Sequence, residues 1–88
     1  MEYKKKLESI CEEMRREVTR AVELHGSMKS QHDAYGVILE ELDEFWDEVK
    51  INPKKLSPDD QERRLARMRN ELIQLGAMAI RAIYDLGL

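Results

Sequence analysis

Apolar side chains recur at steps of three and four along most of this chain, and two short segments interrupt the pattern. This spacing places the apolar residues on one side of an α-helix. No stretch alternates apolar and polar residues in the manner of a β-strand. The chain has 88 residues, near the lower size limit for a domain with a self-sufficient core. We therefore predict a single all-α domain over residues 1–88, built from three helices.

Breakers and capping residues mark the ends of the first two helices. The first is predicted over residues 2–24, because Gly26 follows as a common C-terminal stop. Ser30 followed by Asp33 resembles a capping box and predicts the start of the second helix. This helix is predicted to end before Asn52-Pro53, since the residue before a proline disfavours helical angles. Its predicted buried stripe is Tyr35, Ile38, Leu39, Leu42, Phe45, Trp46 and Val49.

The third helix has a clear start and an unusually wide apolar arc. Ser57 is a favourable cap, and Pro58 suits the first helical position. The predicted inward stripe is Leu65, Met68, Leu72, Leu75, Ala79, Ile83 and Leu86, and a second apolar set on another side is Ile73, Ala77, Ile80 and Tyr84. Two neighbouring helices would not cover both sets. We therefore predict a homo-oligomer, a dimer or a tetramer, in which each three-helix protomer joins a larger helical bundle.

Charge and composition exclude several classes of protein. The formal net charge is −3, which is unlike the basic footprint of a nucleic-acid-binding protein. No apolar run is long enough to span a bilayer, and the N-terminus lacks the apolar core of a secretory signal. Cys11 is the only cysteine, so no disulfide can form within the chain. The expectation is a cytoplasmic protein that binds neither nucleic acid nor membrane.

Acidic side chains on the second and third helices are predicted to meet. On a helical projection, Glu41, Glu44 and Glu48 form one ridge beside the apolar stripe of the second helix. Glu71 flanks the apolar arc of the third helix, and Gln74 is its neighbour three residues later. If the two helices pack antiparallel, Glu41, Glu44 and Glu71 converge, with Glu48 and Gln74 nearby.

Carboxylates held together at a partly buried seam repel one another, and protonation or a cation relieves the repulsion. Carboxylate and amide oxygens suit hard ions such as Mg²⁺ or Mn²⁺. A protein-bound Mg²⁺ ion usually keeps several waters and takes further ligands from substrate phosphates. The pattern therefore indicates a metal–phosphate site. The alternative interpretation is an ordinary solvated acidic face.

These residues resemble a known family. The segment His32–Glu44 resembles the E-E-x-x-E motif of the MazG-like nucleotide pyrophosphohydrolases, which belong to the all-α NTP pyrophosphatase superfamily. The second motif of that family, E-x-x-D, lies on a later helix, where this chain has Glu71-Leu72-Ile73-Gln74. The resemblance covers roughly residues 30–86.

The resemblance implies an activity and roles for the acidic residues. It implies Mg²⁺-dependent hydrolysis of a nucleoside triphosphate to a monophosphate and pyrophosphate, in house-cleaning or nucleotide-pool control, by a dimer or tetramer of helical bundles. Glu41, Glu44 and Glu71 would be metal ligands, and Glu48 a further ligand or the base that orients the attacking water. Gln74 replaces the aspartate of the family. Its carbonyl oxygen is still a possible metal ligand, but one negative charge is lost, so we expect weaker binding of the ion.

Three further residues are candidates for contacts with substrate. Lys29 and His32 lie at the start of the second helix, where the N-terminus favours anions; the alternative for His32 is a solvent-facing residue. Arg67 lies on the same flank as Glu71 and either reaches a phosphate or pairs with an acid on a neighbouring helix. An alternative function also stays open, a catalytically degenerate MazG-like oligomer that binds nucleotide or another protein.

Overall fold

The protein is described here by a computed structural model that covers residues 2–88 and is all-helical. α1 spans Glu2–His25, α2 spans Gln31–Val49 and α3 spans Pro58–Asp85, and a 3₁₀ turn, η1, spans Pro53–Lys55. No strand occurs within residues 2–88. The prediction of an all-α chain with three helices is confirmed. None of the described helices combines the length and the apolar character needed to cross a membrane.

Side-chain caps explain where α2 and α3 begin. The hydroxyl of Ser30 accepts a hydrogen bond from the backbone N–H of Asp33 at 3.0 Å. The Asp33 carboxylate in turn accepts one from the backbone N–H of Lys29 at 3.0 Å. Ser57 caps α3 in the same way, through the N–H of Asp60 at 3.1 Å. These bonds satisfy backbone donors that have no partner within the helix, so both predicted starts are confirmed.

The segments between the helices have their own local causes. α1 ends at His25, and the next residue, Gly26, has a φ of +70°, in the left-handed region where a Cβ would be strained. After α2, the side chain of Asn52 accepts a hydrogen bond from the N–H of Lys54 at 3.0 Å. Pro53 suits the first position of the short turn that follows. This 3₁₀ turn was not predicted.

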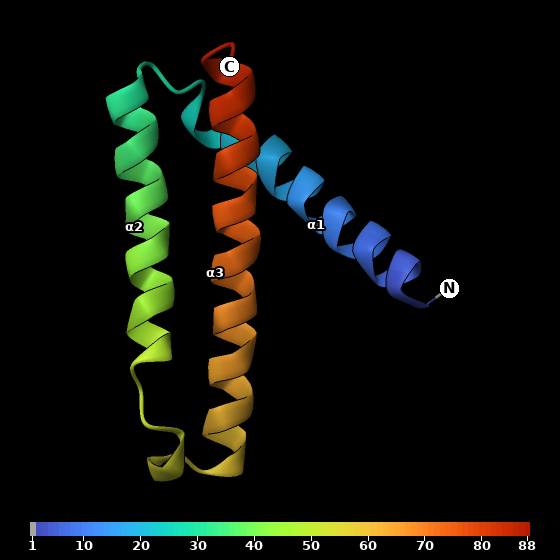
Figure 1. Ribbon diagram of the computed structural model, residues 1–88, viewed down its shortest axis with the longest axis vertical. Coiled ribbons are helices and arrows are strands. Elements are labelled where there is room, and N and C mark those ends of the chain that lie inside the picture. The colour runs from blue at the N-terminus through green and yellow to red at the C-terminus, as the bar shows by residue number, and fades with distance from the viewer. Residues whose placement is uncertain (1) are drawn as a thin grey trace.

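α2 and α3 form an antiparallel pair, and α1 leans across α3 (Figure 1). The C-terminal half of α1 packs against α3, whereas its N-terminal half projects away from the other helices (Figure 1). Gly76 lies at the crossing: a Cβ built there would come within 2.6 Å of the terminal carbon of Met14. An ion pair between Arg69 and Glu13 joins the same two helices. The small residue on α3 therefore lets α1 approach closely.

The interior of the chain is small. Its buried apolar residues are mostly alanines, and none of the large side chains among residues 2–88 is fully buried; the cluster is Ala21, Met28, Ala34, Ala77, Met78 and Ala82. The chain exposes 6,788 Å² of surface, whereas a folded monomer of its mass exposes roughly 5,400 Å². Its radius of gyration is 15.0 Å, against about 12 Å for a domain of this length. A large part of the apolar surface thus stays uncovered within one chain.

The structure corrects the assignment of the inward stripes. Leu65, Leu72 and Ile83 were predicted to point inward, but they are 52%, 44% and 57% exposed. Ile73 and Ala77, from the second apolar set, are buried instead, because α1 crosses α3 on their side. Most of the predicted α2 stripe is exposed as well.

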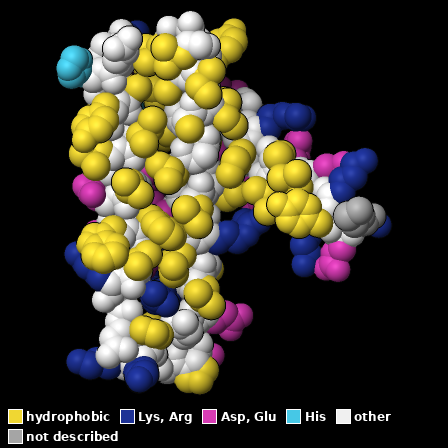
Figure 2. Space-filling view, viewed as in Figure 1, with side chains coloured by type: hydrophobic (Ala, Val, Ile, Leu, Met, Phe, Trp, Pro, Cys, Tyr) yellow, Lys and Arg dark blue, Asp and Glu magenta, His cyan; other side chains and the backbone are white. Residues whose placement is uncertain are grey.

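We refer to the uncovered residues as the apolar face: Tyr35, Leu39, Leu42, Trp46 and Val49 of α2 with Leu65, Leu72 and Ile83 of α3. Hydrophobic side chains spread widely over this part of the surface (Figure 2).

Candidate metal centre

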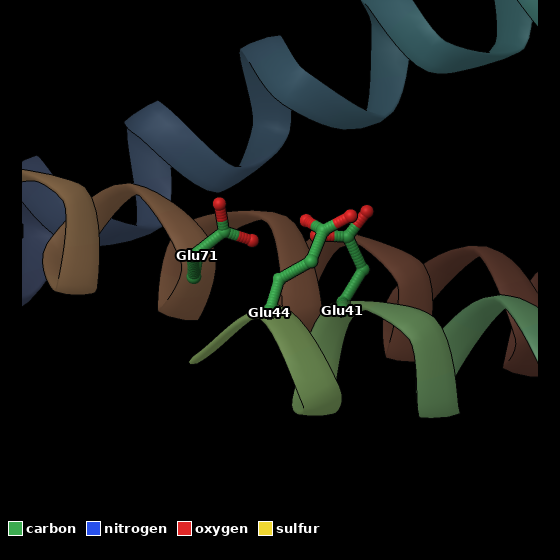
Figure 3. A group of neighbouring side chains, drawn as sticks. All are labelled: Glu41, Glu44 and Glu71. Carbon is green, nitrogen blue, oxygen red and sulfur yellow. The ribbon is translucent and has the colours of Figure 1, made fainter. Parts of the chain in front are cut away.

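Three carboxylates from two helices meet beside the contact between α2 and α3. Glu41 and Glu44 lie one turn apart on α2, and Glu71 lies on α3. One oxygen of each lies within 4.8 Å of the others. Their carboxyl groups gather on one side of the α2–α3 pair (Figure 3). We call this cluster the glutamate triad. Its predicted convergence is confirmed, and it follows from the antiparallel packing of the two helices.

Two oxygens of the triad are buried without a hydrogen-bond partner. They are Oε2 of Glu41 and Oε2 of Glu71. Glu44 is more open to solvent than the other two. A buried acceptor that has lost its water and gained no donor costs free energy, and more so when it is charged. The triad therefore lacks a positively charged or hydrogen-donating partner that would balance these oxygens.

The surroundings raise the pKa of all three carboxyl groups. Burial is the main cause at Glu41, to which the nearby charges of Glu44 and Glu40 add. A hydrogen bond with Glu71 is the main cause at Glu44, followed by burial. At Glu71 burial again raises the pKa most. Without a cation, protons are therefore the groups that relieve the repulsion in the triad.

The donor set fits a hard divalent cation. Carboxylate oxygens alone line the cluster, as Mg²⁺ and Mn²⁺ prefer, and no histidine or cysteine belongs to it. The two orphaned oxygens are available as ligands. The more open position of Glu44 leaves one side for water or phosphate oxygens. These residues therefore suit an ion that is held by a few carboxylates and completes its shell from outside the protein.

Glu48 was predicted as a further metal ligand or as the base, and Arg67 was predicted to reach a phosphate or to pair with an acid on a neighbouring helix; the two are bound to each other. Nε of Arg67 donates to Oε1 and Oε2 of Glu48 at 2.7 and 3.0 Å. This bond raises the pKa of Arg67. Beneath the pair, the buried Arg64 donates to the backbone carbonyl of Glu48 at 2.8 Å. The structure thus brings Glu48 close to α3 through an arginine, and not into the triad.

The remaining predicted residues lie apart from the three carboxylates. Gln74 is half-buried on α3 and, together with Glu41, lines a hollow beside the triad. Lys29, just before α2, and His32, in its first turn, are exposed and lie nine or more residues before Glu41. Along a helix that separation corresponds to roughly 13 Å or more. Neither side chain contributes to the triad in this structure.

The sequence reasoning missed Arg81, which is 5% exposed. Its guanidinium donates to the carbonyl of Gly26 and lies 4.0 Å from Asp85. Asp85 in turn accepts from the backbone N–H of Met28 at 2.9 Å. The sequence signal for this buried pair is an arginine followed four residues later by an aspartate, on the side of α3 that carries Ala77. That spacing is common on solvated helices, so it does not by itself indicate a buried pair.

Comparisons with protein-family models, with curated proteins and with solved structures found no match for this chain. The resemblance to the MazG-like family therefore rests on the two acidic motifs and their spacing.

Proposed function

We propose that this protein is a divalent-metal-dependent nucleoside triphosphate pyrophosphohydrolase that releases a monophosphate and pyrophosphate. The observation that carries the proposal is the glutamate triad. Three carboxylates from two helices converge, and two of their buried oxygens have no partner. A module held together only by apolar contacts gains nothing from this arrangement, because it loses free energy to repulsion and desolvation. The net charge of −3 also argues against nucleic acid as the ligand.

Each acidic residue has a distinct part in the proposed site. Glu41 and Glu71 hold Mg²⁺ or Mn²⁺ through their buried oxygens, and Glu44 binds it from the more open side. The ion, when bound, offsets charge on the phosphate oxygens and lowers the pKa of a bound water. Gln74 lines the hollow, and in this proposal its amide oxygen accepts a hydrogen bond from water or substrate. Its neutrality leaves the site with one charge fewer than the aspartate of the family.

The pair of Arg67 and Glu48 borders this site on α2 and α3. Two hydrogen bonds fix the Glu48 carboxylate, and such a carboxylate orients a water better than a mobile one. The Arg67 side chain is 54% exposed, so its remaining N–H groups are accessible to a phosphate. In this proposal Glu48 acts on the attacking water and Arg67 on the leaving pyrophosphate. In this proposal Lys29 and His32 act on more distant parts of the substrate.

Self-association is part of the proposal, because one chain leaves the apolar face uncovered. The surface in excess of that expected for a monomer is roughly 1,400 Å². A stable interface buries about 800 Å² on each partner, and permanent dimers bury more. A second copy of the chain provides a matching apolar face by symmetry. We therefore propose a homodimer or a tetramer of such dimers as the working form.

The apolar face also supports a second candidate function. A homo-oligomer that binds nucleotide or another protein without hydrolysis has the same need to cover it. The replacement of the family aspartate by Gln74 favours this candidate, because a site that binds the ion more weakly supports slower hydrolysis. The two candidates differ only in whether the triad binds an ion and supports turnover.

Incubation with a panel of canonical and modified nucleoside triphosphates in the presence of Mg²⁺ tests the proposal. We expect release of pyrophosphate from at least one of them. Glu41→Gln and Glu44→Gln should lower the rate by at least about a hundredfold, because each removes a metal ligand. Glu62→Gln on the exposed start of α3 is the matched control and should leave the rate unchanged. No pyrophosphate from any member of the panel, together with no calorimetric signal for Mg²⁺ or Mn²⁺, would favour the non-catalytic oligomer.

A further inference from the structure

A hollow of about 440 Å³ opens between α1, α2 and α3 beside the glutamate triad. Its volume lies in the range of about 300–1,000 Å³ that is usual for small-molecule sites. Glu41 belongs both to the triad and to the wall of the hollow, and Gln74 lines the same end. Arg81 lines the other end, seven residues further along α3. The hollow therefore extends roughly 10 Å along α3 from the proposed metal site.

The guanidinium of Arg81 is buried but incompletely bonded. One terminal nitrogen donates to the carbonyl of Gly26. The other has only the thioether sulfur of Met78 as acceptor, at 3.5 Å, and sulfur is a weak acceptor. Nε has no hydrogen-bond partner, and the carboxylate of Asp85 lies 4.0 Å from the terminal nitrogen that donates to Gly26. A buried cation with unused donors favours a ligand that brings a hydrogen-bond acceptor.

The charges around the hollow disfavour an anion at this end. Arg20, the other arginine in the wall, is already bound by Glu17 at 2.6 Å. Asp33, Glu40 and Glu41 also line the wall, so carboxylates outnumber arginines there. A phosphate near Arg81 would face these negative charges, and the other basic groups that line the hollow are Arg20, which Glu17 already binds, and His25. A neutral group with an acceptor atom avoids that repulsion.

The remaining walls suit a flat ring. Ala21 of α1, Val37 of α2 and Met78 of α3 contribute apolar surface on different sides of the hollow. Methionine sulfur and aliphatic carbons pack well against aromatic rings. A neutral planar group with acceptor atoms at its edge matches both these walls and the donors of Arg81. A nucleobase has these properties.

We propose that the hollow binds the nucleoside part of the substrate, with its base between Val37 and Met78 and an acceptor atom of the base bonded to Arg81. This inference rests on the proposed function for the identity of the ligand, because the phosphates then extend past Gln74 to the triad. Arg81 is in this view a specificity-determining residue. It selects bases by the position of their acceptors, at the end of the site away from the reacting phosphates.

Nucleoside titrations followed by NMR test the site without any catalysis. The chain is labelled at its methionine methyl groups and titrated, with EDTA present, with uridine, cytidine, adenosine and guanosine in turn. At least one nucleoside should shift the methyl signal of Met78 in a saturable way. The signal of Met68, which is not part of the hollow, should stay in place. Arg81→Met should weaken this binding roughly tenfold to a hundredfold, as expected for loss of a charged donor.

A second variant keeps the test valid if Arg81→Met does not fold, since Arg81 also anchors the loop at Gly26. Val37→Trp fills the hollow from α2 and leaves Arg81 unchanged. It should abolish the nucleoside shift at Met78 and raise the KM for the triphosphate, while the affinity for Mg²⁺ stays the same. Val22→Trp on the exposed surface of α1 is the matched control and should bind nucleoside as the wild type does.

Different outcomes separate this inference from the proposed function. Pyrophosphate release without a shift of Met78 by any nucleoside would overturn the subsite and leave the hydrolase in place. A shift of Met78 by inorganic phosphate and by none of the nucleosides would also overturn it, because the hollow would then be an anion site. If nucleosides still bind to Glu41→Gln and Glu44→Gln, and the wild type hydrolyses no triphosphate, the nucleoside subsite is supported and the proposed hydrolase function is contradicted.

Discussion

Arg67 holds both carboxylate oxygens of Glu48, at 2.7 and 3.0 Å from its Nε, one helical turn beyond Glu44 on α2. Glu48 is therefore neutralised by an arginine, whereas the triad beside it has no such partner. The negative charge of Glu48 is thus balanced within the protein, whereas the negative charges of the neighbouring triad are not. The difference leads to a direct prediction about which of them bind the ion.

Substitution of Glu48 should affect metal binding much less than substitution of the triad. We expect Glu41→Gln to weaken Mn²⁺ or Mg²⁺ binding at least tenfold, because it removes a ligand. Glu48→Gln should change the affinity less than about threefold and lower kcat instead, because a glutamine at this position no longer takes a proton from water. Calorimetric titration of both variants and the wild type measures the affinities. Equal losses of affinity in the two variants would place Glu48 among the ligands.

The raised pKa values of the triad predict a pH dependence of stability for the metal-free protein. The folded state holds protons on Glu41, Glu44 and Glu71 at a pH where the unfolded chain, with ordinary values near 4.5, has released them. The unfolding free energy must then fall as pH rises from about 4.5 through the raised values. Glu13 and Asp60 have lowered pKa values and act in the opposite sense, but below about pH 4.5.

Thermal unfolding between pH 5 and pH 8 checks this dependence. The Tm without metal should decrease across the range, and Glu41→Gln should flatten the decrease and raise the Tm at pH 8 by about 2–5 °C. Saturating Mg²⁺ should restore the wild type but not the variant, and its affinity should fall toward pH 5 because protons compete for the same oxygens. Glu62→Gln should keep the wild-type slope. A flat wild-type profile without metal would contradict the electrostatic description of the triad.

Local sequence signals were sufficient for the helices and for the triad. The caps at Ser30 and Ser57 act through neighbours three residues away, so the chain predicts its own helix starts. Glu41 and Glu44 are a turn apart on one helix, and the short connection favours an antiparallel partner that brings Glu71 opposite them. These relationships depend on helix geometry more than on the details of packing.

The sequence predicted the wrong apolar side of α3 to face its own chain. Leu72 and Ile73 are neighbours about 100° apart on the helix, and both sides are apolar enough to be buried. The choice depends on where α1 crosses, and that depends on the contact of Gly76 with Met14. The ion pair between Arg67 and Glu48 was likewise one of several that the arginines of α3 offered. Long side chains with many rotamers make such pairing unpredictable from spacing alone.

The crossing of α1 over α3 predicts a coupled effect at positions 76 and 14. Alanine is favoured over glycine within a helix by about 1 kcal/mol, but a Cβ at position 76 would press on the flexible end of Met14. Gly76→Ala alone should therefore change the unfolding free energy by less than about 1 kcal/mol. In a Met14→Ala background, the same substitution should stabilise by about 1 kcal/mol.

Urea unfolding of the four proteins in this cycle measures the coupling. Gly36→Ala, at a helical glycine with no atoms within 4 Å of an added Cβ, is the control and should stabilise in both backgrounds alike. Destabilisation by Gly76→Ala that persists without Met14 would mean that other atoms limit the approach of α1.

The apolar face predicts that association depends on one side of α3 and not on the opposite side. Ala79 lies four residues from Ile83 and seven from Leu72, so it shares the apolar face, whereas Ala66 points to another side of the helix. Both alanines are exposed in the single chain. Ala79→Glu should place a charge in the contact with the second copy and weaken association roughly a hundredfold or more. Ala66→Glu should leave the mass measured by light scattering unchanged.

The monomer produced by Ala79→Glu should also have a lower Tm, because the small interior of one chain lacks the apolar burial that the partner supplies. A monomeric wild type, or equal masses for the two variants, would show that the apolar face is covered by something other than a second copy.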